Sequence, residues 1–153
     1  MPELPDLPGD DDPQARSGSW IPVAAIAVVA AVHTVLLHGR NYVQNDDIFQ
    51  FTAAQKWGLS WDLLRLNVFN HFGPINRASH WAVLQLSPLN PDAALAASVA
   101  YLVAALASLN WLMAVLGASA RRRAAIVVLL GSSLPLFMTT TWLDSAVHTY
   151  GAL

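Results

Sequence analysis

Two adjacent carboxylates, Asp46 and Asp47, are the residues of this sequence best suited to chemistry. Neighbouring carboxylates can hold a divalent cation, or one can accept a proton from a hydroxyl while the other binds metal, sugar or backbone amides. The pair also has a local explanation, because aspartate is favoured at helix starts, where it accepts hydrogen bonds from free amides. We treat Asp46 and Asp47 as candidate catalytic residues and possible metal ligands, with helix capping as the alternative.

Asp144 and His148 form a second polar group, four residues apart, after the last long apolar segment. If that segment is helical, the two side chains share one face. Locally, Asp144 is simply the first polar residue after an apolar helix. His71 and His80 have no spacing typical of zinc ligands. We interpret His33, inside an apolar segment, as reaching the membrane interface rather than as a functional polar position.

Composition indicates the setting in which these residues act. Of the 153 residues, 55% are apolar and 12% are charged, and the mean hydropathy is +0.43. A net charge of −2 and a pI near 6.1 argue against binding to nucleic acid. The absence of cysteine excludes a disulfide-stapled secreted scaffold. An integral membrane protein, with the lipid bilayer as its partner, is the remaining class.

Three apolar segments are predicted to be transmembrane helices, namely 20–37, 93–116 and 124–143. At a rise of 1.5 Å per residue, the first spans roughly 27 Å, which is just long enough to cross a bilayer. Pro135 lies in the middle of the third segment and predicts a kink. The expected fold is an all-α integral membrane protein with three transmembrane helices and a helical extracytoplasmic loop between the first and second.

Arginine placement predicts the orientation in the plasma membrane. Arg121, Arg122 and Arg123 crowd into the short turn 117–123, and short basic loops stay cytoplasmic. The proline- and aspartate-rich tail 1–19 is then a disordered cytoplasmic segment ahead of an uncleaved signal anchor. Residues 38–92 and the start of a second outer loop, 144–153, lie outside. Trp20 and Trp142 are expected to anchor opposite faces of this multi-pass protein.

The outer loop 38–92 is longer than a simple connection requires, so we expect it to have structure and function of its own. A helix over 48–57 should end at Gly58, and a second should cover 61–69. Because their aromatic residues outnumber their charges, both are predicted to lie on the outer membrane surface. A third helix, 75–86, should end before Pro88.

This arrangement resembles the N-terminal part of polytopic glycosyltransferases of the GT-C fold. The resemblance covers about residues 20–150 and depends on the Asn45-Asp46-Asp47-Ile48-Phe49 start of the outer loop, the His71-Phe72-Gly73-Pro74 turn and the arginine turn. In that family an acidic pair at the start of the first outer loop lies at the active site. The resemblance implies catalytic roles for Asp46 and Asp47, a second-site role for Asp144, and substrate binding by His71.

The implied activity is transfer of a sugar from a polyprenyl-phosphate donor on the outer membrane face, with a divalent metal ion as a possible cofactor. Family members have seven to thirteen or more spans, whereas three are predicted here. We therefore expect either an N-terminal piece of a larger membrane protein or a reduced relative without catalysis. The alternative function is a non-catalytic three-span membrane protein whose outer loop packs against a partner.

Overall fold

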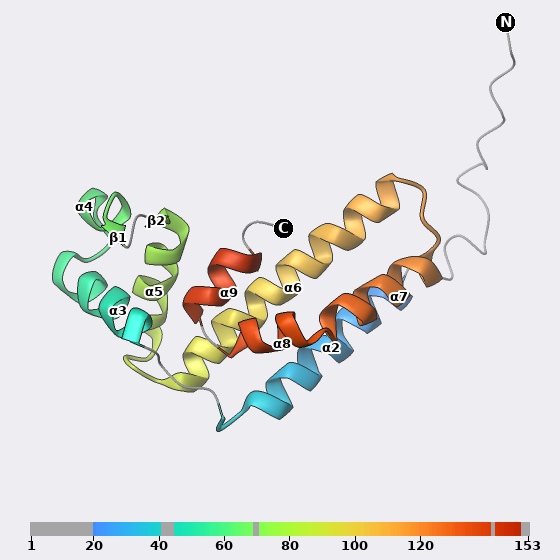
Figure 1. Ribbon diagram of the computed structural model, residues 1–153, viewed down its shortest axis with the longest axis horizontal. Coiled ribbons are helices and arrows are strands. Elements are labelled where there is room, and N and C mark those ends of the chain that lie inside the picture. Colours follow the sequence, from blue (N-terminus) through green and yellow to red (C-terminus); the bar gives the residue numbers. More distant parts are fainter. Residues whose placement is uncertain (1–19, 41–44, 69–70, 142, 151–153) are drawn as a thin grey trace, which may run out of the picture.

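The computed structural model describes residues 20–40, 45–68, 71–141 and 143–150, and these form an all-α fold. Three helices lie side by side as a bundle: α2 (Ile21–Leu37), α6 (Pro91–Val115) and α7 (Ala120–Gly131) (Figure 1). The helices of the segment predicted to be the outer loop, α3 (Asn45–Trp57), α4 (Trp61–Leu64) and α5 (Pro74–Leu86), gather at one end of this bundle. The short helix α8 (Leu134–Thr140) lies against the bundle, and α9 (Leu143–Tyr150) lies between the two groups.

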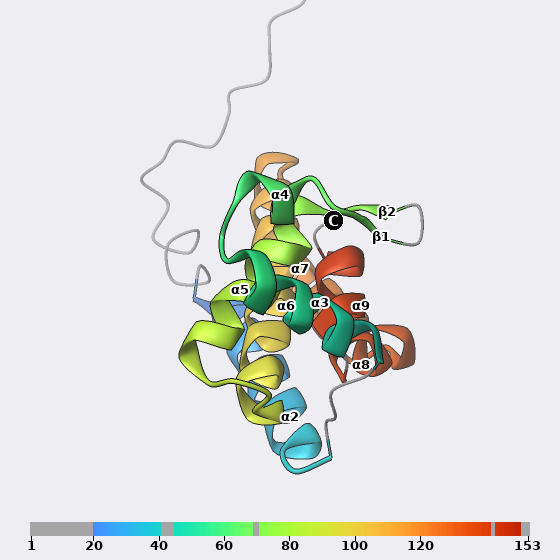
Figure 2. The ribbon, with the colours of Figure 1, turned by 90° about the vertical axis from the view of Figure 1, so that its left-hand side faces the viewer.

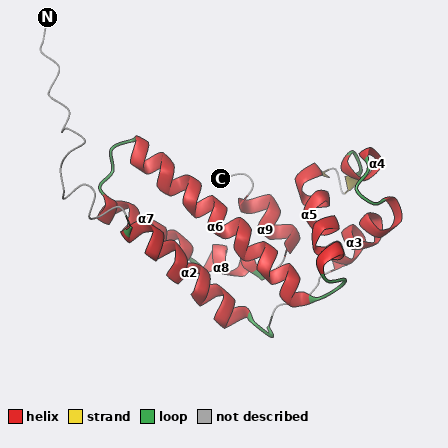
Figure 3. Cartoon of the chain, turned by 180° about the vertical axis from the view of Figure 1, so that it is seen from behind, coloured by secondary structure: helices red, strands yellow, loops and turns green. Residues whose placement is uncertain are grey.

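The core of the bundle joins α2, α6 and α7 through buried aliphatic side chains. Ile26 and Val29 of α2 pack with Leu102 and Leu106 of α6 and with Val127 of α7. Figures 1 and 3 show α6 running antiparallel to its two neighbours. The turn from α6 to α7 uses Gly117 at a φ of +78°, a conformation that glycine adopts without the penalty of a Cβ atom. The bundle thus places the end of α6 next to the arginines that open α7.

One described helix, α6, is long and apolar enough to cross a membrane, and the bent pair α7 and α8 could form a second, broken span. Only 33% of the apolar α6 window is buried within the protein. The helix α2 is apolar but has 17 residues, which is shorter than the usual span. The apolar segments at 20–37 and 93–116 are therefore helical close to their expected bounds.

The bend expected near Pro135 is confirmed, but the segment 124–143 is not one continuous helix. Helix α7 ends at Gly131, α8 begins at Leu134, and the two are bent by 63°. Pro135 has no N–H and cannot donate to the Gly131 carbonyl four residues earlier, so it opens a new helix from its first turn instead. The arginines assigned to the turn 117–123 belong to the first turn of α7. The proposed anchor Trp142 lies outside the described residues.

His33 supplies the hydrogen bond that Pro135 cannot make. Its Nε2 lies 2.8 Å from the Gly131 carbonyl oxygen and its Nδ1 lies 3.0 Å from Thr140 Oγ1. Because a carbonyl oxygen only accepts, Nε2 is the donor. The side chain is 2% exposed, so the interpretation that His33 reaches the membrane interface is wrong. It ties the end of α2 to the break between α7 and α8.

In the outer loop, two helix ends are confirmed and one expected helix is wrong. Helix α3 ends at Trp57, directly before Gly58, whose φ is +59°, and α5 ends before Pro88. The helix expected over 61–69 stops at Leu64, because the chain next enters a two-stranded ladder, β1 (Asn67–Val68) and β2 (His71–Phe72). Backbone pairing of Asn67 with Phe72 and of Val68 with His71 replaces the helical bonds.

Candidate functional site

The candidate site forms where α3 packs against α5. Helix α3 buries Asp47, Gln50, Phe51 and Ala54, which recur at the spacing of one helical face. Asp46 and Asp47 occupy its first turn, where the positive end of the helix dipole favours carboxylates. The predicted helix start is therefore confirmed, and Asp47 is only 1% exposed and points into the protein interior.

The buried face of helix α5, which packs against α3, is unusually polar. Its buried residues are Asn76, Arg77, His80 and Val83, again at helical spacing. Pro74 opens the helix in its first turn, where the missing N–H costs nothing. Arg77 turns back to that start, because its Nη1 donates to the Gly73 carbonyl oxygen at 2.6 Å. The two helices thus bury polar groups beside apolar contacts such as that of Phe51 with Val83.

The central contact is a hydrogen bond between Asp47 and His80. Asp47 Oδ1 lies 2.9 Å from His80 Nε2, and His80 Nδ1 lies 2.9 Å from the Asn76 carbonyl oxygen. The His80 side chain is 0% exposed. Phe51 contacts the imidazole edge to face, with ring centroids 5.0 Å apart. The imidazole is held on three sides by groups from both helices.

Hydrogen-bond chemistry determines how many protons this pair holds. The Asn76 carbonyl only accepts, so Nδ1 of His80 carries a hydrogen. One further proton lies between Nε2 and Asp47 Oδ1, bound to either atom. In both arrangements the pair has no net charge, which is the state a low-dielectric interior tolerates best. This dyad is a neutral, buried unit that fixes α3 on α5.

Asp46 and Gln50 are the remaining polar groups of α3 near the dyad. The Asp46 side chain is half-buried and is thus the more accessible carboxylate of the acidic pair. The Gln50 side-chain oxygen is buried and has no hydrogen-bond partner among the described residues. Asp46 is therefore the more accessible member of the pair, while Asp47 is hydrogen-bonded to His80.

Helix α9 brings the second acidic position into the same part of the molecule. Leu143 and Val147 of α9 pack in one cluster with Phe51 of α3, Val83 of α5 and Ala94 of α6. Figure 2 shows α9 beside α3, in the half of the molecule that contains the outer-loop helices. Asp144 lies in the first turn of α9, next to the buried Leu143. Its side chain and that of His148 lie outside the described ones.

The remaining expected site residue, His71, lies in β2, and its side chain is also outside the described ones. Among the described residues no group of three or more histidine, cysteine or acidic side chains could hold a metal ion. His80 is the residue that sequence reasoning missed. Its partner is 33 positions away, and only the polar helical spacing of Asn76, Arg77 and His80 could have pointed to it.

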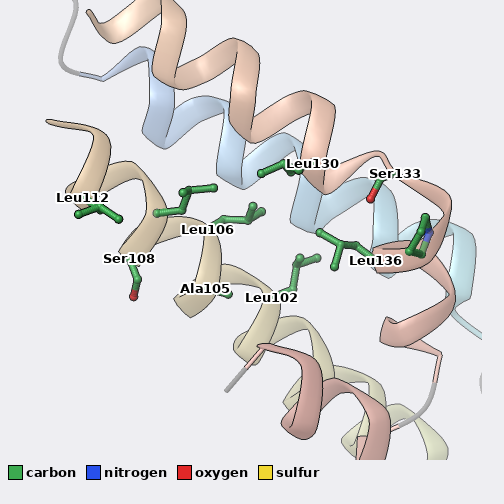
Figure 4. Close-up of a pocket in the computed structure, with 10 residues that line it drawn as sticks. Leu102, Ala105, Leu106, Ser108, Leu112, Leu130, Ser133 and Leu136 are labelled. Atoms are coloured by element: carbon green, nitrogen blue, oxygen red, sulfur yellow. The ribbon is translucent and has the colours of Figure 1, made fainter. Parts of the chain in front are cut away.

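A groove of about 410 Å³ lies away from the dyad, on the bundle. Leucine and alanine side chains of α6 and leucines of α7 and α8 line it, with Ser108 and Ser133 as its polar groups (Figure 4). No residue of α3 or α5 contributes to this lining. The polar site and the apolar groove are separate features.

In comparisons with protein-family models, curated proteins and solved structures, the chain matches none of them.

Proposed function

We propose that this chain is the membrane-embedded acidic-loop region of a glycosyltransferase that takes a sugar from a polyprenyl-phosphate donor at the outer membrane face, either alone or within a larger membrane protein. The observation that carries the proposal is the acidic pair at the start of α3. Figures 1 and 3 place α3 at the end of the bundle opposite the arginines of α7. That separation fits a cytoplasmic arginine turn and an outer-face carboxylate pair.

The proposal includes three membrane passages: α2, α6 and the broken pair α7 and α8. Support comes from large apolar side chains that these helices leave exposed, an arrangement that suits acyl chains and is rare on proteins in water. A length of 17 residues gives α2 about 25 Å of helix, which a bilayer can accommodate by local thinning. The exposed residues of the bundle include Val23, Val28, Val32, Val35, Leu112, Val115, Val128 and Leu129.

In the proposed reaction Asp46 is the general base and Asp47 is a positioning residue. Asp46 accepts the proton of an acceptor hydroxyl as that oxygen attacks the anomeric carbon. The bond between the sugar and the lipid phosphate breaks, and the phosphate leaves with the bonding electrons. Asp47, held by His80, orients the first turn of α3 and with it the neighbouring Asp46. No metal is required for this proton balance.

A structural role for the acidic pair is the second candidate, and the burial of Asp47 favours it. A carboxylate at 1% exposure that binds a histidine of the neighbouring helix serves packing without any substrate. In that case the chain is a non-catalytic membrane protein that acts through partners. The two functions differ in what Asp46 does, because Asp46 is dispensable for packing but essential for base catalysis.

The test compares Asp46→Asn with Asp47→Asn in the full chain reconstituted with labelled polyprenyl-phosphate sugars. Asparagine is useless as a base, so we expect Asp46→Asn to lower transfer by roughly 10²–10⁴-fold at an unchanged melting temperature. Asp47→Asn should lower the melting temperature, since it disturbs the buried dyad. Full transfer by Asp46→Asn, or no transfer by the unmutated chain, would contradict the catalytic proposal for this chain.

A further inference from the structure

We propose that the end of the bundle remote from α3 carries a binding surface for the headgroup of an anionic phospholipid. The surface consists of Trp20, Trp111, Arg121, Arg122 and Arg123, and we call it the Arg-Trp surface. Figures 1 and 3 show the start of α2, the end of α6 and the start of α7 together at this end. The inference rests on the membrane assignment above but not on the transferase activity.

The fold concentrates the three arginines on one helical turn. Ser119 begins α7 as its cap, because its Oγ accepts a hydrogen bond from the Arg122 amide at 3.5 Å. The arginines therefore occupy the first turn of α7, where the helix dipole is also positive. Cations at this position destabilise a helix by charge repulsion. The arginines therefore do not stabilise α7 by themselves. Their positive charges at this position suit the binding of an anion from outside the protein.

No carboxylate of the bundle neutralises these charges. The segments 20–40 and 93–143 contain no aspartate or glutamate, and the described carboxylates lie in α3, α4, α9 and the first turn of α6. Arg121 and Arg122 are exposed. Arg123 is half-buried, and its Nη1 donates to Asn110 Oδ1 at 3.2 Å, a neutral partner that leaves the charge in place. Arg121 and Arg122 thus expose two positive charges at the start of α7, and Arg123 adds a third beside α6.

The aromatic residues distinguish a lipid from a free phosphate. Trp20 and Trp111 are 64% and 68% exposed at the same end of the bundle, and amphipathic rings of this kind prefer the headgroup level of a bilayer. Exposed Leu112, Val115 and Leu116 lie along the end of α6. Apolar and aromatic side chains are therefore exposed at the same end of the bundle as the arginines, a combination that suits the acyl chains and the phosphate of a phospholipid. A soluble phosphate needs only the arginines.

Competition between phosphatidylglycerol and phosphatidylcholine for the detergent-solubilised full chain, measured by native mass spectrometry, tests the proposal. We expect a preference for phosphatidylglycerol that Arg121→Gln/Arg122→Gln lowers by about fivefold for each arginine, which corresponds to roughly 1 kcal/mol each. Arg121→Lys/Arg122→Lys should retain most of the preference because it keeps the charge. The matched control Arg40→Gln/Arg65→Gln removes two positive charges elsewhere and should leave the preference unchanged.

Three outcomes would overturn the proposal. The first is an undiminished preference in Arg121→Gln/Arg122→Gln, and the second is an equal loss in the control. The third is binding of soluble glycerol phosphate as tight as that of phosphatidylglycerol, which would indicate a free anion as the ligand. Retention of neither lipid would contradict the membrane assignment itself. The lipid-binding experiment does not use the transferase assay, so a failure of catalysis leaves its results unaffected.

Discussion

The Asp47–His80 pair makes the stability of α3 on α5 depend on single residues. Both side chains are buried, so removal of either partner breaks this hydrogen bond in a low-dielectric interior. We expect Asp47→Ala and His80→Ala each to lower the free energy of unfolding by about 3–5 kcal/mol, measured by denaturant titration in detergent. The double variant should lose less than the sum, since the two changes remove one shared interaction.

Strict additivity in this cycle would contradict the pairing. Asp62→Ala is a matched control, because Asp62 pairs with Arg65 on an exposed surface of α4. Surface ion pairs of this kind contribute at most about 1 kcal/mol. A comparable loss in both variants would mean that burial does not strengthen the Asp47 contact.

The acidic pair could be located from sequence, but its partner could not. Asparagine and two aspartates before an apolar run predict a helix start, and the first turn of α3 holds both carboxylates. The role of Asp47 depends on a histidine brought close by the path of α4 and the β-ladder between α3 and α5. Residue spacing along the sequence does not predict how the chain between α3 and α5 folds. Sequence therefore identified the candidate residues without distinguishing the accessible carboxylate from the buried one.

At the scale of elements, the break between α7 and α8 depends on His33. Replacing it by leucine removes the donor to the Gly131 carbonyl, and a buried unsatisfied carbonyl costs about 1–3 kcal/mol. Pro135→Ala restores an N–H four residues after Gly131, so a continuous helix can satisfy the carbonyl itself. We expect His33→Leu to destabilise the wild-type background by that amount and the Pro135→Ala background by less. Equal destabilisation in both backgrounds would show that His33 does not replace the proline's missing donor.

Gly131 also sets how closely α7 approaches α2. A Cβ atom at this position would lie 2.6 Å from Val29 Cγ1, and the β-branched valine has little freedom to turn away. We expect Gly131→Ala to cost about 1–3 kcal/mol of unfolding free energy in detergent, and Val29→Ala to relieve part of that cost. Ser132→Ala, at the exposed neighbouring position, is the control and should change little. Lack of relief in the double variant would place the clash elsewhere.

These two contacts explain why the elements were predicted unequally well. Apolar run length and flanking glycine or proline located α2, α6, α3 and α5 to within a few residues. The third segment contains equally apolar residues, so composition predicted one kinked span where the chain makes two helices. Its break is stabilised by a histidine and a close glycine contact from other segments of the chain, and run length does not report such contacts.

At the scale of the whole molecule, the bundle separates two surfaces of different charge. One end carries arginines and exposed tryptophans, and the other carries the acidic start of α3 and the exposed aromatics Phe49 and Trp61. That α3 and α4 lie on the outer membrane surface stays a prediction, and so does the orientation itself. The orientation follows from one physical asymmetry, because translocation of a short arginine turn is unfavourable.

Thiol labelling of this cysteine-free chain tests the orientation. The structure identifies two exposed positions that do not cap a helix with their side chains: Leu59, at the outer-loop end, and Leu116, between α6 and α7. We expect a membrane-impermeant maleimide to label Leu59→Cys in intact cells and Leu116→Cys only after the membrane is opened. Ser17→Cys, in the N-terminal tail, should behave like position 116 if α2 crosses the bilayer with its start inside. Labelling of position 116 in intact cells would reverse the orientation. It would move the Arg-Trp surface to the outer face and Asp46 to the cytoplasmic one, and the proposed outer-face chemistry would be lost with it.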